Sequence, residues 1–310
     1  MEATAAAIND RALSCSQRFY GFDIACFGPA AYSGRREYFD MKKTYGAIVS
    51  VMALFLAGAS LGLAQPSITS GGILNGASFA TGVQITPGSL ISIFGTNFAA
   101  HAASADTIPL SNTLGGVSVE FVNGNTKLPA PMLFADSTQL NVEVPWELVP
   151  NGTTANVNVI VTNNGKASAP AQVTVGPFSP GVFASNGLAI AVNPDGTLAW
   201  PVGAVPGLTT HPAKIGEALV LYANGLGAVK NPPADGQNSI NELRNTLVPP
   251  QVTVGGVTAP IIFAGLSPQF VGVNQVNITV PAVAPGDSLP LEIKVGGITS
   301  PSNITIAVSQ

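Results

Sequence analysis

Residues 139 to 145 read Gln139-Leu-Asn-Val-Glu-Val-Pro145, and the same frame returns as Gln275-Val-Asn-Ile-Thr-Val-Pro281. In both segments apolar side chains alternate with polar ones, which is the pattern of a β-strand with one buried face. The shared order is glutamine, apolar, asparagine, apolar, any residue, valine, proline. A frame of this length that recurs 136 residues later indicates two copies of one folding unit.

The sequence around the two frames repeats in the same order. The aligned pairs are Leu90–Phe98 with Leu219–Leu226, Gly116–Val119 with Gln251–Val254, Pro129–Ala135 with Thr258–Ala264, Gly152–Val159 with Gly286–Ile293, and Ser168 with Ser300. We therefore predict that the copies superpose strand for strand. We also expect the matched side chains Gln139/Gln275 and Asn141/Asn277 to hold equivalent positions and to bond to backbone groups.

The remaining sequence after residue 64 has the same strand-and-turn character. Alternating runs such as Val157–Val161 and Leu291–Val295 are separated by turn signals of the Asn-Gly and Gly-Gly type, at Asn123-Gly124, Asn164-Gly165, Gly255-Gly256 and Gly296-Gly297. No window has the apolar spacing of an amphipathic helix. Short strands at regular intervals with such turns predict an all-β chain of two tandem immunoglobulin-like β-sandwich domains.

We assign residues 65–180 to the first sandwich, and residues 181–310 to a connector hairpin followed by the second sandwich. The connector is rich in proline and glycine: it includes Pro177–Phe183, a hairpin turn at Asn193–Gly196, and Pro201–Pro212. Because proline restricts the backbone, we expect the connector to be stiff and the two sandwiches to keep a preferred orientation.

Residues 41–64 have the three parts of a secretory signal peptide. Met41-Lys42-Lys43 is followed by the uncharged run Ala47–Ala57 and by small residues that end at Ala64. The apolar run is short for a transmembrane helix, which is the alternative reading. We expect translation to begin at Met41, which makes residues 1–40 an unstructured extension from a start codon assigned too early. The exported chain then begins near Gln65.

Composition excludes several classes of function. Both cysteines, Cys15 and Cys26, precede Gln65, so the exported chain has no thiol for a disulfide or for metal binding. Only 9% of all residues are charged, and the formal net charge is −4. A sparse and slightly negative set of charges cannot neutralise a phosphate backbone, so we predict no nucleic-acid partner.

Four further segments carry a family resemblance: Leu74-Asn-Gly-Ala-Ser-Phe79, Pro87–Gly95, Ser179-Pro-Gly-Val-Phe183 and Tyr222-Ala-Asn-Gly-Leu-Gly227. With the two repeated frames, they resemble an uncharacterised C-terminal module of exported acidobacterial proteins. The halves of that module are similar to IPT/TIG domains, an early-set immunoglobulin-like group. The resemblance covers roughly residues 68 to 308 and implies a β-sandwich fold and export. It implies no catalytic residue.

Residues able to perform catalysis are few. The two histidines are His101, in a loop-like stretch with Asp106 five residues later, and His211, in the connector. Gly286-Asp-Ser-Leu289 spells a lipase and esterase signature, but no histidine follows Ser288 to serve as its base. We interpret that segment as a turn before a strand. A loop residue such as His101 is more often solvated, and we expect neither histidine to be catalytic.

Paired carboxylates for glycoside hydrolysis remain possible from sequence alone. However, Glu120, Glu143 and Glu292 lie on or beside alternating strands, where we expect them to point into solvent. We find no motif for a metal or a cofactor and predict neither. Trp146 and Tyr222 are expected to pack in the core or at its rim. Trp200, after the connector hairpin, is the better candidate for an exposed ring, although packing is favoured for it too.

Three hypotheses about function follow. The first is a non-catalytic structural or adhesive binding module, located at the cell surface, outside the cell or in the periplasm, whose partner is a protein or a glycan. The second is a carbohydrate-binding accessory protein that uses Trp200 or loop residues. The third, and least favoured, is a glycoside or ester hydrolase.

Overall fold

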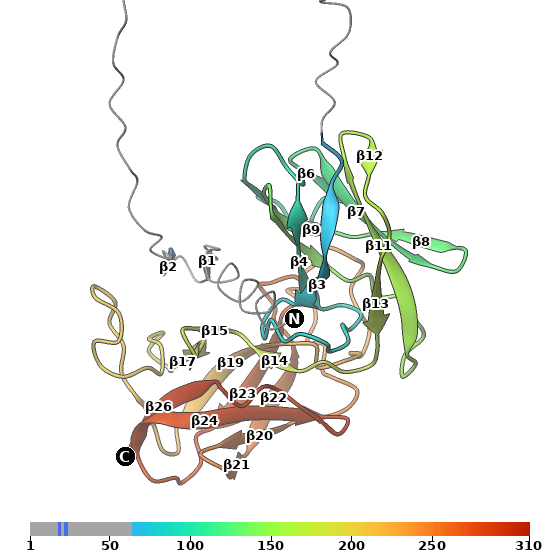
Figure 1. Ribbon diagram of the computed structural model, residues 1–310. Coiled ribbons are helices and arrows are strands. Elements are labelled where there is room, and N and C mark those ends of the chain that lie inside the picture. Colours follow the sequence, from blue (N-terminus) through green and yellow to red (C-terminus); the bar gives the residue numbers. More distant parts are fainter. Residues whose placement is uncertain (1–17, 20–21, 24–63) are drawn as a thin grey trace, which may run out of the picture. The chain divides into compact units, whose positions relative to one another are not determined.

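The computed structural model describes residues 18–19, 22–23 and 64–310 (Figure 1). The first four of these form the antiparallel pair β1 (Arg18–Phe19) and β2 (Phe22–Asp23). The predictions of an unstructured extension and of a signal peptide otherwise fall outside the described residues. No helix occurs in the part of the chain that the structure describes. The prediction of an all-β chain is confirmed.

The first sandwich consists of two antiparallel sheets. One sheet has the order β3 (Ser67–Asn75), β4 (Leu90–Thr96), β10 (Gln139–Glu143), β9 (Met132–Ala135), β5 (Ala103–Ser104). The other has the order β12 (Lys166–Ala167), β11 (Ala155–Asn163), β7 (Val117–Asn123), β6 (Thr113–Leu114), with β13 (Ala171–Val175) beside β11 and β8 (Thr126–Pro129) beside β7.

The second sandwich repeats this arrangement. Its first sheet has the order β14 (Gly181–Val182), β19 (Ala218–Asn224), β23 (Asn274–Thr279), β22 (Ile261–Leu266), with β17 (Ala191–Val192) also on β19. Its second sheet has the order β15 (Ala184–Ser185), β16 (Leu188–Ala189), β26 (Thr305–Ser309), β24 (Gly286–Val295), β20 (Gln251–Val254), β21 (Val257–Ala259), with β18 (Ala213–Lys214) on β26 and β25 (Ile298–Thr299) on β24.

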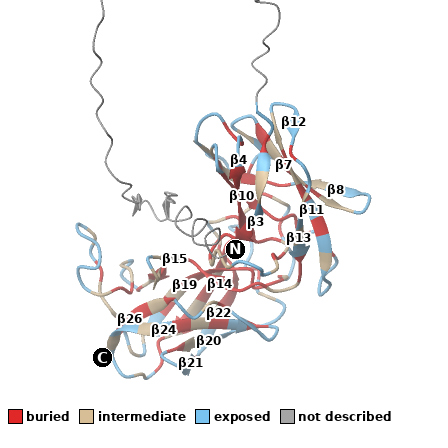
Figure 2. Ribbon diagram, viewed as in Figure 1, coloured by how far each residue is buried: buried red, intermediate tan, exposed pale blue. Residues whose placement is uncertain are grey.

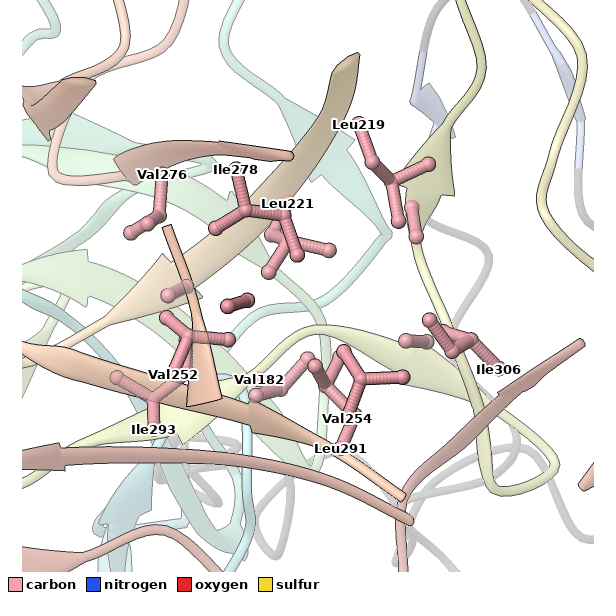
Figure 3. Packing of buried hydrophobic residues seen from close by; sticks show 14 of the residues in the cluster. Val182, Leu219, Leu221, Val252, Val254, Val276, Ile278, Leu291, Ile293 and Ile306 are labelled. Carbon is pink, nitrogen blue, oxygen red and sulfur yellow. The ribbon is translucent and has the colours of Figure 1, made fainter. Parts of the chain in front are cut away.

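Each sandwich has its own apolar core between its sheets, visible as the buried stretches in Figure 2. Val157, Val159 and Val161 on β11 are fully buried, whereas the alternating Asn156 and Asn158 are exposed. Figure 3 shows the second core, where side chains from facing strands converge; among them are Leu221, Val252, Ile278 and Ile293. The alternating apolar residues thus form the buried faces of two sandwiches of immunoglobulin-like type.

The repeated frames occupy equivalent strands. Gln139 lies on β10, between β4 and β9, and Gln275 lies on β23, between β19 and β22. In each copy the glutamine Nε2 donates to the Oδ1 of the asparagine two residues later, at 2.8 Å for Asn141 and 2.9 Å for Asn277. The equivalence is therefore confirmed. The expected bonds from these side chains to backbone groups are replaced by bonds between the two amide side chains.

A serine marks a second equivalence and corrects one alignment. The N–H of Val161 donates to Ser168 Oγ, and the N–H of Ile293 donates to Ser300 Oγ, both at 3.0 Å. Val161, not Val159, is therefore the counterpart of Ile293. The aligned pair was shifted by two residues, and a shift of two leaves the same side chains facing the core, which is why the sequence pattern did not reveal it.

The connector is part of the second sandwich. The predicted turn at Asn193–Gly196 is present, with the Asn193 N–H donating to Thr197 O at 2.8 Å. Ala189, Ala191 and Ala199 are buried in the second core. The connector is thus held by packing and by strand pairing, in addition to any stiffness from its prolines.

Candidate functional site

Neither histidine forms a hydrogen bond to the side chain of a serine or threonine among the described residues. His101 is exposed in a loop. His211 is held in the connector: its Nδ1 lies 2.9 Å from Pro212 O and its Nε2 lies 2.9 Å from Asp195 Oδ2. These two hydrogen bonds raise the pKa of His211, with the Pro212 carbonyl as the larger cause. Because both ring nitrogens are engaged, this imidazole is not free to act as a base for a nucleophile.

Asp195 is fixed in turn by the hairpin. Its Oδ1 accepts from the Thr197 hydroxyl at 2.7 Å and from the Thr197 N–H at 3.0 Å. These bonds, together with the contact to His211, lower the pKa of Asp195. Through its bond to Asp195, His211 holds the hairpin against the segment that follows Thr210. Ser288 lies near the start of β24 and not at a strand-to-helix turn.

The three aromatic candidates for ligand stacking are buried. Trp200 is 2% exposed and donates from Nε1 to Ala189 O at 2.6 Å, and Tyr222 is 0% exposed. Trp146 is 8% exposed and packs with Val229 and Leu266. The favoured prediction of packing is confirmed for all three, and a glycan site built on Trp200 is excluded.

Glu143 departs most from its predicted environment. It was expected in solvent, yet it is fully buried, because both faces of β10 are covered. Its Oε2 accepts from the N–H of Gly236, in a loop of the second sandwich, at 2.6 Å. Burial is the main cause that raises its pKa to about 8, and nearby Asp235 adds to the rise. The carboxyl group is therefore largely protonated at neutral pH.

The same loop makes further bonds to the first sandwich. The N–H of Trp146 donates to Asp235 Oδ1 at 2.9 Å, and the N–H of Leu110 donates to Gly236 O at 2.9 Å. Burial also raises the pKa of Asp235. A general acid must reach its substrate, and Glu143 cannot, since none of its surface is accessible. Glu120 and Glu292 are partly exposed, as expected.

A buried amide pair joins the two sandwiches. Asn224 donates from Nδ2 to Leu90 O at 2.7 Å and to Asn75 Oδ1 at 3.1 Å, and its Oδ1 accepts from the Leu90 N–H at 3.1 Å. Asn75 donates to Ser179 O at 2.7 Å. Gly225, at φ +70°, has no room for a Cβ against Ser179 O. These residues lie in the segments that carry the family resemblance.

Among the hollows on the surface of the described residues are two that differ in character. One, of about 270 Å³, lies at the junction and is lined mainly by apolar groups, among them Pro87, Trp146, Phe178 and Leu247. The other, of about 630 Å³, is a groove between β3 and β13 of the first sandwich, and includes the polar residues Thr69, Ser70, Gln84, Gln172 and Thr174. Neither hollow is lined by an acidic residue, a basic residue or a histidine.

Sequence reasoning missed Asn75, Asn224 and Asp235 as functional positions. The signal available for the first two was their place next to glycine in motifs outside the repeated frames. Asp235 gave no signal, because it lies in a long loop whose partner is more than eighty residues away in sequence, at Trp146.

Histidine and carboxylate side chains nowhere gather in groups of three suited to a metal ion among the residues that the structure describes. Nor does this part of the chain include a helix with the length and hydrophobicity of a membrane span.

No family model matches this chain, and no curated protein matches it by sequence. Solved structures with a similar architecture exist. The surface glycan-binding protein PbSGBP-B from Prevotella bryantii is 14% identical with a TM-score of 0.24, over 76% of this chain and 41% of that chain. SGBP-B of the mixed-linkage glucan utilization locus of Bacteroides ovatus is 14% identical with a TM-score of 0.30, over 73% and 43%.

The titin fragment A168169 is 10% identical with a TM-score of 0.20, over 80% of this chain and 100% of that chain. The matches to the two glycan-binding proteins cover 41% and 43% of those proteins, so this chain spans less than half of their length. Similarity at this level does not transfer a ligand or an activity to this chain.

Proposed function

We propose that this chain is an exported, non-catalytic binding module that acts in a structural or adhesive role at the cell surface or outside the cell. The observation that carries the proposal is the lining of the two hollows described above, which contains no acidic residue, basic residue or histidine. The groups with shifted pKa values, Glu143, Asp195, His211 and Asp235, form hydrogen bonds that hold the fold. These four groups are thus engaged in contacts that stabilise the fold.

The junction supports a structural role. Asn75 and Asn224 are almost fully buried and satisfied by hydrogen bonds across the two sandwiches. A satisfied polar network specifies one arrangement, because any other leaves buried amides without partners. Two sandwiches joined in this way present their loops and edges at a constant spacing. Export is proposed from the pattern of residues 41–64, and membership of the IPT/TIG-like module stays a proposal on its motifs.

A carbohydrate-binding accessory role is the alternative. A neutral groove with hydroxyl and amide groups, such as Thr69, Ser70 and Gln172, suits a neutral glycan. However, the tryptophans and Tyr222 are buried, so none of these flat rings is available to stack on a sugar. We therefore rank a polypeptide partner above a glycan.

A substrate panel and a glycan array on the purified protein test the proposal. We expect no turnover of ester or glycoside substrates above a buffer control. Turnover that survives rigorous purification, and disappears in a variant of a single polar residue with an unchanged melting curve, overturns the non-catalytic reading.

A further inference from the structure

One edge of the first sandwich is open. β13 pairs with β11 on one side, and on the other side only Ile85 bridges to Val175, in parallel orientation. The Ile85 N–H donates to Thr174 O at 2.9 Å, so the polar backbone groups of Thr174 point to this side. Alternate residues of a strand face the same edge, so the Gln172 N–H points there as well. Beyond Ile85, no described residue continues the ladder along this edge.

The second sandwich supplies the comparison. The bonds of Ser168 and Ser300 align β11 with β24, so that Val159 corresponds to Leu291. Ala171 pairs with Val159, and Ile304 bonds to Leu291, so Ala171 corresponds to Ile304. Gln172 and Thr174 are therefore the counterparts of Thr305 and Ala307. A parallel bridge is found at the same place in both copies, because Ala213 pairs with Val308 as Ile85 pairs with Val175.

In the second sandwich this edge is covered by the chain itself. β16 and β18 both pair with β26 in parallel orientation. The Thr305 N–H donates to Gly187 O at 2.8 Å, and the Ala307 N–H donates to Ala199 O at 3.0 Å. The same two amide positions thus have backbone carbonyl acceptors in one copy and face a groove in the other.

Side-chain burial differs in the same way. Ile306, the counterpart of Val173, is fully buried under the covering segments. Val173 and Ala171 are only half-buried and line the groove. The opposite wall of the groove is β3, which bulges there. Ile68 pairs with Gly95 and Ile73 pairs with Ile93, so β3 has three more residues than β4 between these two pairs. The added residues, including Gly71 at φ +68°, line the groove, which measures about 630 Å³.

We propose that an extended segment of a partner polypeptide adds to the open edge of β13, parallel to it, in the groove between β3 and β13. Its carbonyl groups accept hydrogen bonds from the Gln172 and Thr174 N–H groups, and its inward side chains cover Val173 and Ala171. The ladder that Ile85 begins is thereby continued, as in the second sandwich. This inference rests on the proposed function, because it names the partner class of the binding module.

The groove also defines the segment that fits. No charged side chain lines it, so a lysine or glutamate pointing inward would lose its hydration without gaining a counterion. In the second sandwich, the pieces that cover this edge contribute the buried alanines Ala189, Ala199 and Ala213. The partner segment is therefore uncharged, with small apolar residues at alternate positions.

Amide hydrogen exchange measured by NMR on the purified protein tests this pairing. The probe is the capped peptide Thr-Ala-Thr-Val-Thr-Ala-Thr, with a twin of the same sequence that is N-methylated at alternate residues. We expect exchange at Gln172 and Thr174 to slow about tenfold when the peptide is present at ten times its Kd. Thr305 and Ala307, already bonded, are the internal controls and should exchange slowly throughout.

A matched pair of variants separates edge pairing from other binding. Gln172→Pro removes the N–H that faces the groove and leaves the β11 side of the ladder intact, whereas Gln172→Thr retains the N–H. We expect binding to be lost in the first variant and kept in the second. The methylated twin gives the same answer with an unaltered protein, in case Gln172→Pro fails to fold.

Four results overturn the proposal: no protection with the peptide, equal protection with the methylated twin, unchanged binding by folded Gln172→Pro, or slow exchange at Gln172 and Thr174 before any peptide is added. The last result means that the chain covers its own edge. A β-glucan oligosaccharide that protects these amides where the peptide does not would replace the polypeptide with a glycan. It would leave the non-catalytic binding function intact, which only the substrate panel can overturn.

Discussion

Glu143 is a carboxylic acid within an alternating strand, and its position in the fold determines its chemistry. Its neighbour in sequence, Val144, is buried as the alternation predicts, but the opposite face of β10 is covered as well. The carboxyl group loses most of its hydration and gains one backbone donor, from Gly236. Desolvation outweighs that bond, so the pKa rises and the neutral form is favoured.

We predict that the free energy of unfolding falls as the pH rises from about 4.5 to about 8. A carboxyl group whose pKa goes from 4.5 to about 8 on folding binds its proton more tightly in the folded protein. Stability is therefore unaffected below the lower value and declines between the two, by about 5 kcal/mol at about 1.4 kcal/mol per pKa unit. Denaturant melts at a series of pH values measure this decline.

Glu143→Gln should remove most of the pH dependence of the free energy of unfolding, since an amide does not ionise. Glu120→Gln, at a partly exposed position on β7, is the control and should leave this dependence unchanged. The raised pKa of His211 adds a fall of the same sign as the pH passes upward through it, so a smaller slope remains. Identical pH profiles for wild type and Glu143→Gln would contradict the prediction.

Among the strands, the two sandwiches share one contact, a pair of hydrogen bonds between a serine and a strand residue. In each, a serine hydroxyl after the short β12 or β25 accepts from a strand N–H, and the serine N–H donates back to the carbonyl of that strand residue, at 2.7 Å for Ser168 and 2.8 Å for Ser300. A serine that forms both bonds holds the chain where it leaves one hairpin and enters the last strand of its sandwich.

We predict that Ser168→Ala and Ser300→Ala lower the free energy of unfolding by similar amounts, about 1 kcal/mol each, because each leaves one buried strand N–H without its acceptor. Urea denaturation of the two variants measures this, with the exposed Ser137→Ala as a control near zero. A large loss in one variant and none in the other would count against equivalent roles.

At the scale of the whole described unit, the sandwiches unfold together only if the junction couples them. Gln65–Gln310 forms one compact unit, and the Asn224 side chain makes three hydrogen bonds across the junction. Glu143 and Trp146 add contacts to the loop at Asp235 and Gly236. Each hydrogen bond contributes little to stability by itself, but all of them form or break together when the two sandwiches dock or separate.

We predict that Asn224→Ala destabilises the protein by about 1 to 3 kcal/mol, because it leaves the buried Leu90 N–H without an acceptor and removes the bonds from Asn224 to Leu90 O and Asn75 Oδ1. Wild type should unfold in a single urea transition and the variant in two, as the coupling weakens. Asn158→Ala, at an exposed position on β11, should retain the single transition. A single unshifted transition for Asn224→Ala would argue that the junction does not couple the sandwiches.

The start of the exported protein is a further whole-molecule prediction. The pattern from Met41 to Ala64 predicts cleavage near Gln65, which makes the exported form shorter than the 31.4 kDa chain. Intact-mass analysis of protein recovered from the periplasm or the medium measures this. A mass that includes residues 1–40 would refute both the start at Met41 and the cleavage.

Patterns in the amino-acid sequence were enough to predict the all-β class, the duplication and the packing of Trp146 and Tyr222. Alternation with a period of two reports one buried face, and a repeated frame reports a repeated environment, and both can be read locally. Packing was favoured for Trp200 as well, although its place after the connector hairpin made it the better candidate for an exposed ring.

The burial of Glu143 and the positions that join the sandwiches depend on tertiary contacts that no local pattern reveals. Local alternation cannot reveal that a second face is covered by a loop ninety-three residues away, as Gly236 covers Glu143. Nor can it reveal that β13 has an open edge where β26 has a covered one, because the covering segments come from distant parts of the chain. Burial and pairing depend on what the folded chain brings together, and that information is non-local.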